Sequence, residues 1–343
     1  MTDSMLYFLN RKNNKMKNWK KFLIIFLSAS ISTTFSSCED DEDDITPVTQ
    51  PTTGPTQNIA EIAIADSRTD SLVVALETAN LVATFTGTTE YTVFAPTNQA
   101  FINLLGTNSA WNRISDIDAT TLTNVLLYHV TAGKVFASDL TDNTYINTLN
   151  TQGSVNNEAT VIEVDIAGGA KLNNSSNVEA VDIEATNGVI HIIDAVLLPR
   201  NIVELAIIDE RFTSLVAALT VFGDTLTGAL SGNGPFTVFA PTNDAFQRLL
   251  DSDTTWNSLS DIPRATLNAV LTYHVVSGAN AQADEITQDQ VLTTLNGSQL
   301  TVDLSAGAQL ITSNMAQGNV SIIVTDVQGT NGVIHAVENV LLP

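Results

Sequence analysis

Apolar residues change their spacing along the part of the chain that begins at Asn58. Positions 59–63 and 72–81 carry apolar residues three or four apart, which predicts two short amphipathic helices. Asp70 or Ser71 is placed to be the N-cap of the second helix. The domain is therefore expected to open with helices.

A strand, a sharp turn and a helix are predicted next, within eleven residues. β-Branched and aromatic residues fill positions 91–95, and Pro96 ends that strand. Thr97 or Asn98 can then cap a helix whose apolar face lies within 100–105.

One more helix is predicted before the sequence becomes β in character. It covers 119–127 and runs directly into positions 128–130, which are expected to be a strand. The strands predicted after it are 145–149, 160–166, 178–183 and 189–193. Asn187-Gly188 lies between the last two, which favours a two-residue hairpin with a type I′ turn.

The whole pattern occurs twice. A period of about 145 residues indicates a duplicated domain, because solenoid repeats are about 20 to 50 residues long. The copies are expected at 58–199 and 201–343, separated only by Arg200, and each is long enough to bury its own core. The repeated segments are Tyr91–Phe101 with Phe236–Phe246, Tyr128–Val130 with Tyr273–Val275, and Thr186–His191 with Thr330–His335.

These three segments, in this order and present twice, resemble the fasciclin (FAS1) domain. The quoted motifs are T-V-F-A-P-T-N-x-A-F, then Y-H-V, then T-N-G-V-I-H before x-V-L-L-P, and the resemblance covers 58–199 and 201–343. It implies an α+β fold in each copy: a β-sandwich or wedge of about seven strands with several helices packed at one edge. It also implies a role in cell-surface adhesion or matrix binding.

The segment before the first copy has the layout of a bacterial secretory signal over residues 1–37. Lysines precede the apolar run 22–27, which is too short to span a bilayer, and Met16 is an alternative start. Cys38 is the only cysteine and stands where a lipoprotein signal places its acylated residue, although Phe35 replaces the usual Leu. The alternative is a plain thiol near a conventional cleavage site.

Residues 38–57 are expected to form a tether from the lipidated cysteine. An acidic run, 39–44, is followed by a Thr/Pro-rich stretch, and such compositions favour extended chain. The acidic run resembles the surface-export signal of lipoproteins in the Bacteroidetes group, and the alternative is a solvated spacer. The expected location is the cell outer membrane, anchored by lipid and exposed at the surface.

The charge excludes nucleic acid as a main partner. The full chain has a formal net charge of −23, and removal of 1–37 leaves 8 basic against 36 acidic residues, or about −28. Phosphate backbones and anionic lipid surfaces would repel such a chain, so the membrane is expected to be contacted only through the lipid. A single cysteine also means that the cores, without disulfides, stabilise the domains.

The candidate site residues are Tyr128, His129, Tyr273 and His274. All four histidines of the chain fall in the repeated motifs, the other two being His191 and His335. No His-x-x-x-His pair or Gly-x-Ser-x-Gly elbow accompanies them, so we expect no metal, no cofactor and no enzymatic activity. In animal fasciclin proteins the Tyr-His block is tied to receptor contact, which makes it a candidate binding surface. The alternative is that these residues belong to the core.

Three functions remain open at this stage. The first is a lipid-anchored adhesion protein that contacts a protein or polysaccharide of another cell, a matrix or a biofilm. The second is a glycan-binding accessory protein, which would use exposed aromatic residues. However, Trp111 and Trp256 occupy equivalent positions in the repeats, which favours a shared packing role. The third is a hydrolase, which a deep cleft with converging polar groups would support.

Overall fold

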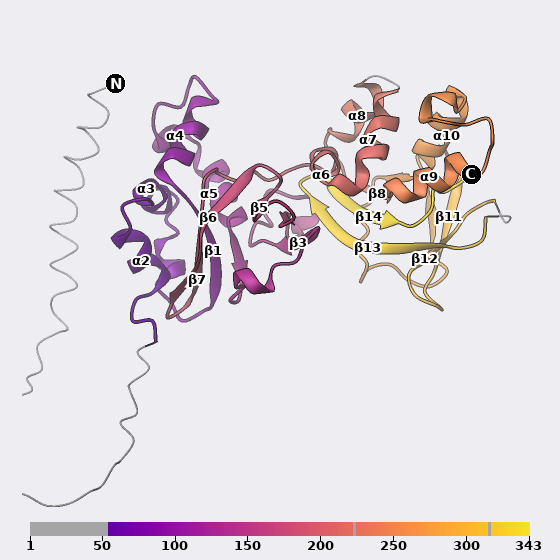
Figure 1. Cartoon of the computed structure of the whole chain (residues 1–343). Coiled ribbons are helices and arrows are strands. Elements are labelled where there is room, and N and C mark those ends of the chain that lie inside the picture. The colour runs from indigo at the N-terminus through magenta and orange to yellow at the C-terminus, as the bar shows by residue number, and fades with distance from the viewer. Residues whose placement is uncertain (1–53, 222–223, 315–316) are drawn as a thin grey trace, which may run out of the picture. The chain divides into compact units, whose positions relative to one another are not determined.

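The computed structural model describes residues 54–221, 224–314 and 317–343. The predicted signal, Cys38 and most of the tether lie outside the described residues. Domain 1 has helices α2 (Ile59–Ala65), α3 (Asp70–Thr78), α4 (Asn98–Gly106) and α5 (Ala119–Tyr128), and 3-10 helices η2 (Val82–Phe85), η3 (Ile114–Asp116), η4 (Ala137–Asp139) and η5 (Val155–Asn157). Its strands are β1 (Tyr91–Pro96), β2 (Val130–Ala132), β3 (Thr144–Asn147), β4 (Val161–Asp165), β5 (Lys171–Leu172), β6 (Ser176–Ala185) and β7 (Gly188–Ile193) (Figure 1).

Domain 2 repeats this order. Its helices are α6 (Ile202–Ile208), η6 (Glu210–Phe212), α7 (Thr213–Thr220), α8 (Asp224–Leu230), α9 (Asn243–Asp251), η7 (Leu259–Asp261) and α10 (Arg264–Tyr273). Its strands are β8 (Phe236–Pro241), β9 (Val275–Ser277), β10 (Val291–Thr293), β11 (Gln299–Asp303), β12 (Gln309–Ile311), β13 (Val320–Gly329) and β14 (Gly332–Val337). None of the helices in the described ranges is long and apolar enough to cross a membrane.

Each domain contains one seven-stranded sheet with the same topology. The strand order is β2-β1-β7-β6-β5-β4-β3 in domain 1, and domain 2 has the equivalent order β9-β8-β14-β13-β12-β11-β10. The pair β1 and β7 is parallel, as is β8 with β14, whereas the other pairs are antiparallel. The predicted duplication and the seven strands per copy are confirmed.

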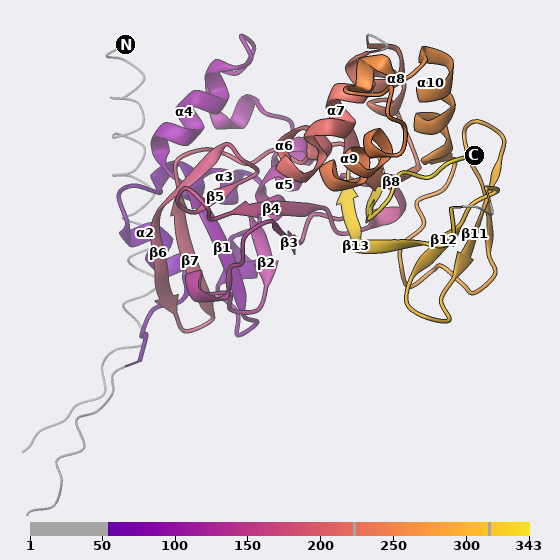
Figure 2. The ribbon, with the colours of Figure 1, turned by 45° about the vertical axis from the view of Figure 1, so that its right-hand side comes forward.

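The central strands are buried on both faces, with alternate residues serving two different cores. In β1, Val93 and Ala95 pack with the helices, and Phe94 points to the other side of the sheet. On that side Phe94 packs with Ile162 and Val164 of β4. The register shifts between β6 and β7 bend the sheet, so that β4 lies over β1. One bent sheet thus encloses a sandwich core, while its other face is covered by helices (Figure 2).

The N-cap predicted from the sequence is confirmed for α4 and is wrong for α3. Thr97 caps α4 by accepting a hydrogen bond from Ala100 N at 3.3 Å, as predicted. At α3, neither Asp70 nor Ser71 is the N-cap, because the helix begins at Asp70 after Thr69. The N-terminus of α3 is instead capped by a residue that is distant in the sequence, because Ser71 N donates a hydrogen bond to Asn98 Oδ1 at 2.7 Å.

Two further predictions are corrected at the motif ends. Helix α5 continues through Tyr128 and strand β2 begins only at Val130, so 128–130 is not a continuous strand. The β6–β7 hairpin exists, but its two loop residues, Thr186 and Asn187, lack the positive φ of a type I′ turn. The Asn187 amide instead accepts from Ile59 N and donates to the carbonyls of Phe85 and Gly87, each at 2.9 Å.

Candidate functional site

The first Tyr-His motif lies inside domain 1, at the C-terminal end of α5. Tyr128 and His129 are both buried. The Tyr128 hydroxyl donates to Val161 O of β4 at 2.6 Å and accepts from Asn173 Nδ2 at 3.0 Å. The phenol therefore joins the last turn of α5 to the opposite half of the bent sheet.

The His129 ring has one defined protonation state. Its Nε2 accepts from Leu197 N at 2.8 Å, so the proton must lie on Nδ1, which donates to Val125 O at 2.7 Å. Burial lowers the pKa of His129 to about 4 from its ordinary 6.5. The imidazole is thus neutral at physiological pH, and both of its ring nitrogens are hydrogen-bonded to backbone groups.

Domain 2 reproduces this arrangement. His274 Nδ1 donates to Val270 O at 2.7 Å, and its Nε2 accepts from Leu341 N at 2.9 Å. The Tyr273 hydroxyl donates to Gln299 O at 2.8 Å, and burial lowers the pKa of His274 to about 4 as well. Tyr128, His129, Tyr273 and His274 are all buried, so these side chains pack in the core, as the alternative interpretation held, and do not form an exposed surface in this structure.

The other two histidines are also enclosed. His191 donates from Nε2 to Val135 O at 2.9 Å and accepts at Nδ1 from Asp182 N at 3.3 Å, and its ring stacks on Phe94. His335 makes the same contacts with Ala281 O and Asp326 N. Among the described residues, no group of three or more histidine, cysteine or acidic side chains is arranged to hold a metal ion.

Two small cavities lie within the described part of the chain. One of about 30 Å³ lies under the helices of domain 2 and is lined by apolar residues with His274, and one of about 20 Å³ occupies the equivalent place in domain 1 beside His129. Such volumes hold about one or two water molecules. Trp111 and Trp256 pack against the helix-side cores of their domains, which confirms the predicted packing role.

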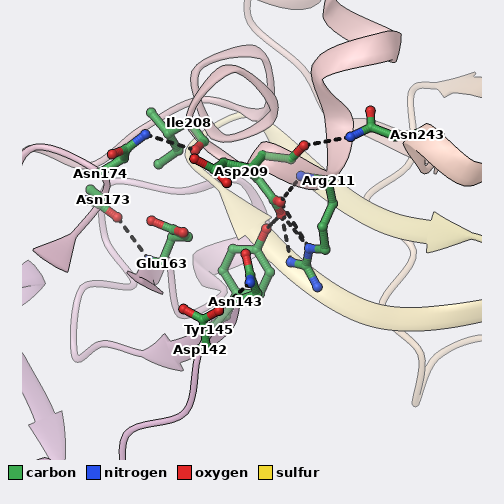
Figure 3. Close-up of polar contacts among 11 residues, drawn as sticks. Asp142, Asn143, Tyr145, Glu163, Asn173, Asn174, Ile208, Asp209, Arg211 and Asn243 are labelled. Atoms are coloured by element: carbon green, nitrogen blue, oxygen red, sulfur yellow. Dashed lines mark hydrogen bonds and ion pairs between the residues drawn. The ribbon is translucent and has the colours of Figure 1, made fainter. Parts of the chain in front are cut away.

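A cluster of polar side chains joins the two domains (Figure 3). Tyr145 of β3 points from domain 1 to Asp209 of domain 2, and its hydroxyl donates to the Asp209 carboxylate. Arg211 donates to the same carboxylate through Nε and Nη2, at 3.0 and 2.6 Å, and its guanidinium lies 5.3 Å from the centre of the Tyr145 ring. Beside them, Val161 of β4 is buried in the core cluster of domain 2. The domains are therefore held together by one packed contact.

A buried carboxyl group completes this interface. Glu163, opposite Tyr145 on β4, is buried, and its Oε2 has no hydrogen-bond partner among the described residues. Burial, with the negative charges of Asp209 and Asp165, raises the pKa of Glu163 to about 7. The protonated form of this side chain therefore persists to a higher pH than that of an ordinary glutamate.

The sequence contained one signal for this interface that the motif search missed. The pair Asp209 and Arg211 repeats Asp66 and Arg68 of domain 1, each directly after the first helix of its domain. Arg68 bonds Asp66 with the same fork, through Nε at 3.1 Å and Nη2 at 2.7 Å. Which of the two pairs meets another domain depends on the packing and cannot be read from the spacing.

We expect Tyr145→Phe to weaken the contact between the domains. The substitution removes the hydroxyl that donates to the Asp209 carboxylate, and a bond to a charged group contributes about 2 kcal/mol. Calorimetry should show the unfolding transitions of the two domains moving apart. Val291→Ala, at the equivalent position of domain 2, is the control and should leave them together; equal behaviour of the two variants would contradict the expectation.

Two consecutive bent sheets, each with helices on one face and histidines buried in the core, define a tandem pair of α+β domains. The fasciclin domain model matches residues 67–199 and 210–343, so the chain belongs to the fasciclin domain family.

Similar proteins occur in cyanobacteria and animals. The uncharacterized protein sll1735 of Synechocystis is 39% identical over 142 residues, covering 41% of this chain and 97% of that protein. Transforming growth factor-beta-induced protein ig-h3 of Sus scrofa is 29% identical over 259 residues, covering 75% of this chain but only 35% of that protein. The solved FAS1 domain pair of the insect cell adhesion molecule fasciclin I has a TM-score of 0.48 and 18% identity, covering 83% of this chain and 96% of that chain.

Proposed function

We propose that this protein is a lipid-anchored cell-surface adhesion protein, held in the outer membrane through Cys38. Its two fasciclin domains contact a protein or polysaccharide of another cell, a matrix or a biofilm, and convert no substrate. The observation that carries the proposal is the burial of all four motif histidines, whose ring nitrogens are bonded to the backbone. The motifs shared by the two domains therefore maintain the fold, and the outer surfaces are left to meet a partner.

Family membership and the domain contact support a binding role. Membership of the fasciclin domain family favours adhesion by analogy at the level of the fold. The site described above contains no set of catalytic residues that would favour a different function. The Tyr145–Asp209 contact also fixes the two domains to each other. Two surfaces at a fixed spacing gain avidity on a repetitive target such as a matrix or polysaccharide.

The anchor is tested by Cys38→Ser. Acylation requires the cysteine thiol, and the attached acyl chains anchor a lipoprotein in the membrane. The Cys38→Ser variant should therefore be lost from the membrane fraction. The measurement is detergent phase partition of cell lysates together with the intact mass of the mature chain. An unacylated wild-type chain would contradict the anchor.

The adhesion role is tested in the same cells. Cells that display the wild-type chain should be retained on immobilised matrix proteins or polysaccharides, and Cys38→Ser cells should be retained less. Gly168→Ala, which keeps the cysteine and has nothing within 4 Å of its added Cβ, serves as a display control for surface amount. Equal retention of cells with and without the protein, on every substratum, would contradict adhesion even if the anchor is present.

A further inference from the structure

The face that domain 1 uses to hold domain 2 is present again in domain 2. In domain 1 this outer face consists of Tyr145, Val161 and Glu163 on β3 and β4. Counting back from the repeated Thr-Leu-Asn at 148–150 and 294–296 makes Val291 the equivalent of Tyr145. Val291 pairs with Thr301, as Tyr145 pairs with Glu163.

In domain 2 this outer face is open. Val291, Thr301 and Ile311 lie side by side on three neighbouring strands, β10, β11 and β12, and point away from the sandwich core. Their neighbours Leu292, Leu300 and Leu310 fill that core. Val291 is 51% exposed and Ile311 is 38% exposed, so an apolar strip faces solvent where domain 1 is covered.

The complementary surface is also present twice. In domain 2 it is the Asp209–Arg211 corner, where the side chains are 1% and 25% exposed because Tyr145 covers them. In domain 1 the Asp66–Arg68 corner has the same fork geometry, but its side chains are 20% and 48% exposed. Each chain thus has one used and one unused copy of both surfaces.

We propose that the outer face of domain 2, Val291, Thr301 and Ile311, docks on the Asp66–Arg68 corner of a second copy of this chain. The contact repeats between molecules the one that joins domain 1 to domain 2 within the chain. It is heterologous, because two different surfaces meet, so association builds a ring or an open chain of molecules and not a dimer joined by one self-complementary surface.

The intermolecular contact is weaker than the one within the chain, for reasons visible in the residues. Val291 provides no phenol for the carboxylate and the guanidinium of the corner, in contrast to Tyr145. The loop between β3 and β4 also reaches domain 2, where Val155 N donates to Thr330 O at 3.0 Å, and the equivalent turn between β10 and β11 is much shorter. A weak contact of this kind becomes effective when many copies are held close together on one surface.

The decisive experiment restores the missing phenol. Sedimentation velocity of the purified full chain, in the same non-ionic detergent throughout, is measured over a range of concentrations with no other ligand. The average mass of the wild type should rise with concentration without stopping at two copies. Val291→Tyr should associate about tenfold more tightly, since it adds a hydrogen bond to Asp66 and a ring beneath Arg68.

Two controls identify the surfaces. Arg68→Ala, combined with Val291→Tyr, should remove most of the gain, since the cation opposite the new ring is lost. Val221→Tyr adds the same ring at an exposed position at the end of α7 in domain 2, which belongs to neither surface, and should change nothing. A wild-type chain that remains monomeric at every concentration, a plateau at two copies, or an equal gain from Val221→Tyr would overturn the proposal. Because no adhesion ligand is used, the result is independent of the function proposed above.

Discussion

Acidification from pH 7 to pH 4 is expected to lower the free energy of unfolding of domain 2 by about 3 kcal/mol. Burial lowers the pKa values of His129 and His274 to about 4, whereas in the unfolded chain each imidazole takes up a proton below its ordinary 6.5. Between these values the unfolded state binds more protons than the folded state. The stability is therefore complete above pH 6.5 and is lost as the pH falls to 4.

The two domains should respond differently to this acidification. Glu163 has a raised pKa of about 7, so its carboxyl favours folding below its ordinary 4.5 and loses that contribution as the pH rises through 7. Over this pH range its contribution is similar in size and opposite in sign to the loss from His129, so domain 1 should change little. Domain 2 has Thr301 at the equivalent position and should show the full loss.

Denaturant titrations at a series of pH values, followed by fluorescence of Trp111 and Trp256, measure this effect. The exposed carboxylates with lowered pKa values, such as Asp66 and Asp116, act below their ordinary value of 3.8 and do not contribute in this pH range. Burial also lowers the pKa of His335, which adds to the loss in domain 2. The control is a His129→Gln, His274→Gln double variant, whose domain 2 should be less stable at pH 7 but should depend less on pH between 6.5 and 4. An unchanged slope in that variant would show that the two histidines do not cause the effect.

Gly188→Ala is expected to destabilise domain 1 by about 4 kcal/mol or more, the range reached only by severe core disruption. An added Cβ would lie 1.9 Å from Tyr91 O and 2.7 Å from Ile59 Cδ1, and the φ of +154° is one that side-chain-bearing residues rarely adopt. The clash is with the backbone of the parallel neighbour β1, so neither strand can move without breaking the pairing of Tyr91 with Gly188.

Thermal unfolding of domain 1, followed through Trp111, measures the effect of Gly188→Ala. Gly168→Ala is the matched control, because nothing lies within 4 Å of its added Cβ, and it should change stability by no more than about 0.5 kcal/mol. Gly332→Ala should reproduce the loss in domain 2, where the Cβ would lie 2.3 Å from Phe236 O. Equal unfolding temperatures for Gly188→Ala and Gly168→Ala would contradict the steric argument.

Local chemistry predicted those elements whose partners are close in sequence. The strand over 91–95 ends at Pro96, Thr97 caps the helix after it, and the last two strands form a hairpin. These features depend on backbone preferences and on spacing within a few residues. The Asn187-Gly188 turn type was wrong because the Asn187 side chain bonds residues about a hundred positions away.

The candidate site failed for the same physical reason. The polar side chains of Tyr128 and His129 are of the kind found in binding sites. They are buried because β4 and the segment at Leu197 pack over the end of α5. The interface residues Tyr145 and Glu163 carry no motif at all. Tyr145 and Glu163 are surrounded by residues of the other domain. The spacing of residues within one domain does not indicate which side chains of a second domain will pack against them.

By itself, the sequence determined that this protein contains two equivalent α+β domains, because duplication, periodicity and capping are properties of neighbouring residues. The tertiary structure alone decided which residues are available to a partner. It buried the Tyr-His motifs, covered the outer face of β3 and β4, and left that of β10–β12 open. Exposure depends on what packs over a side chain, and in this protein that is decided by strands and domains distant in the sequence.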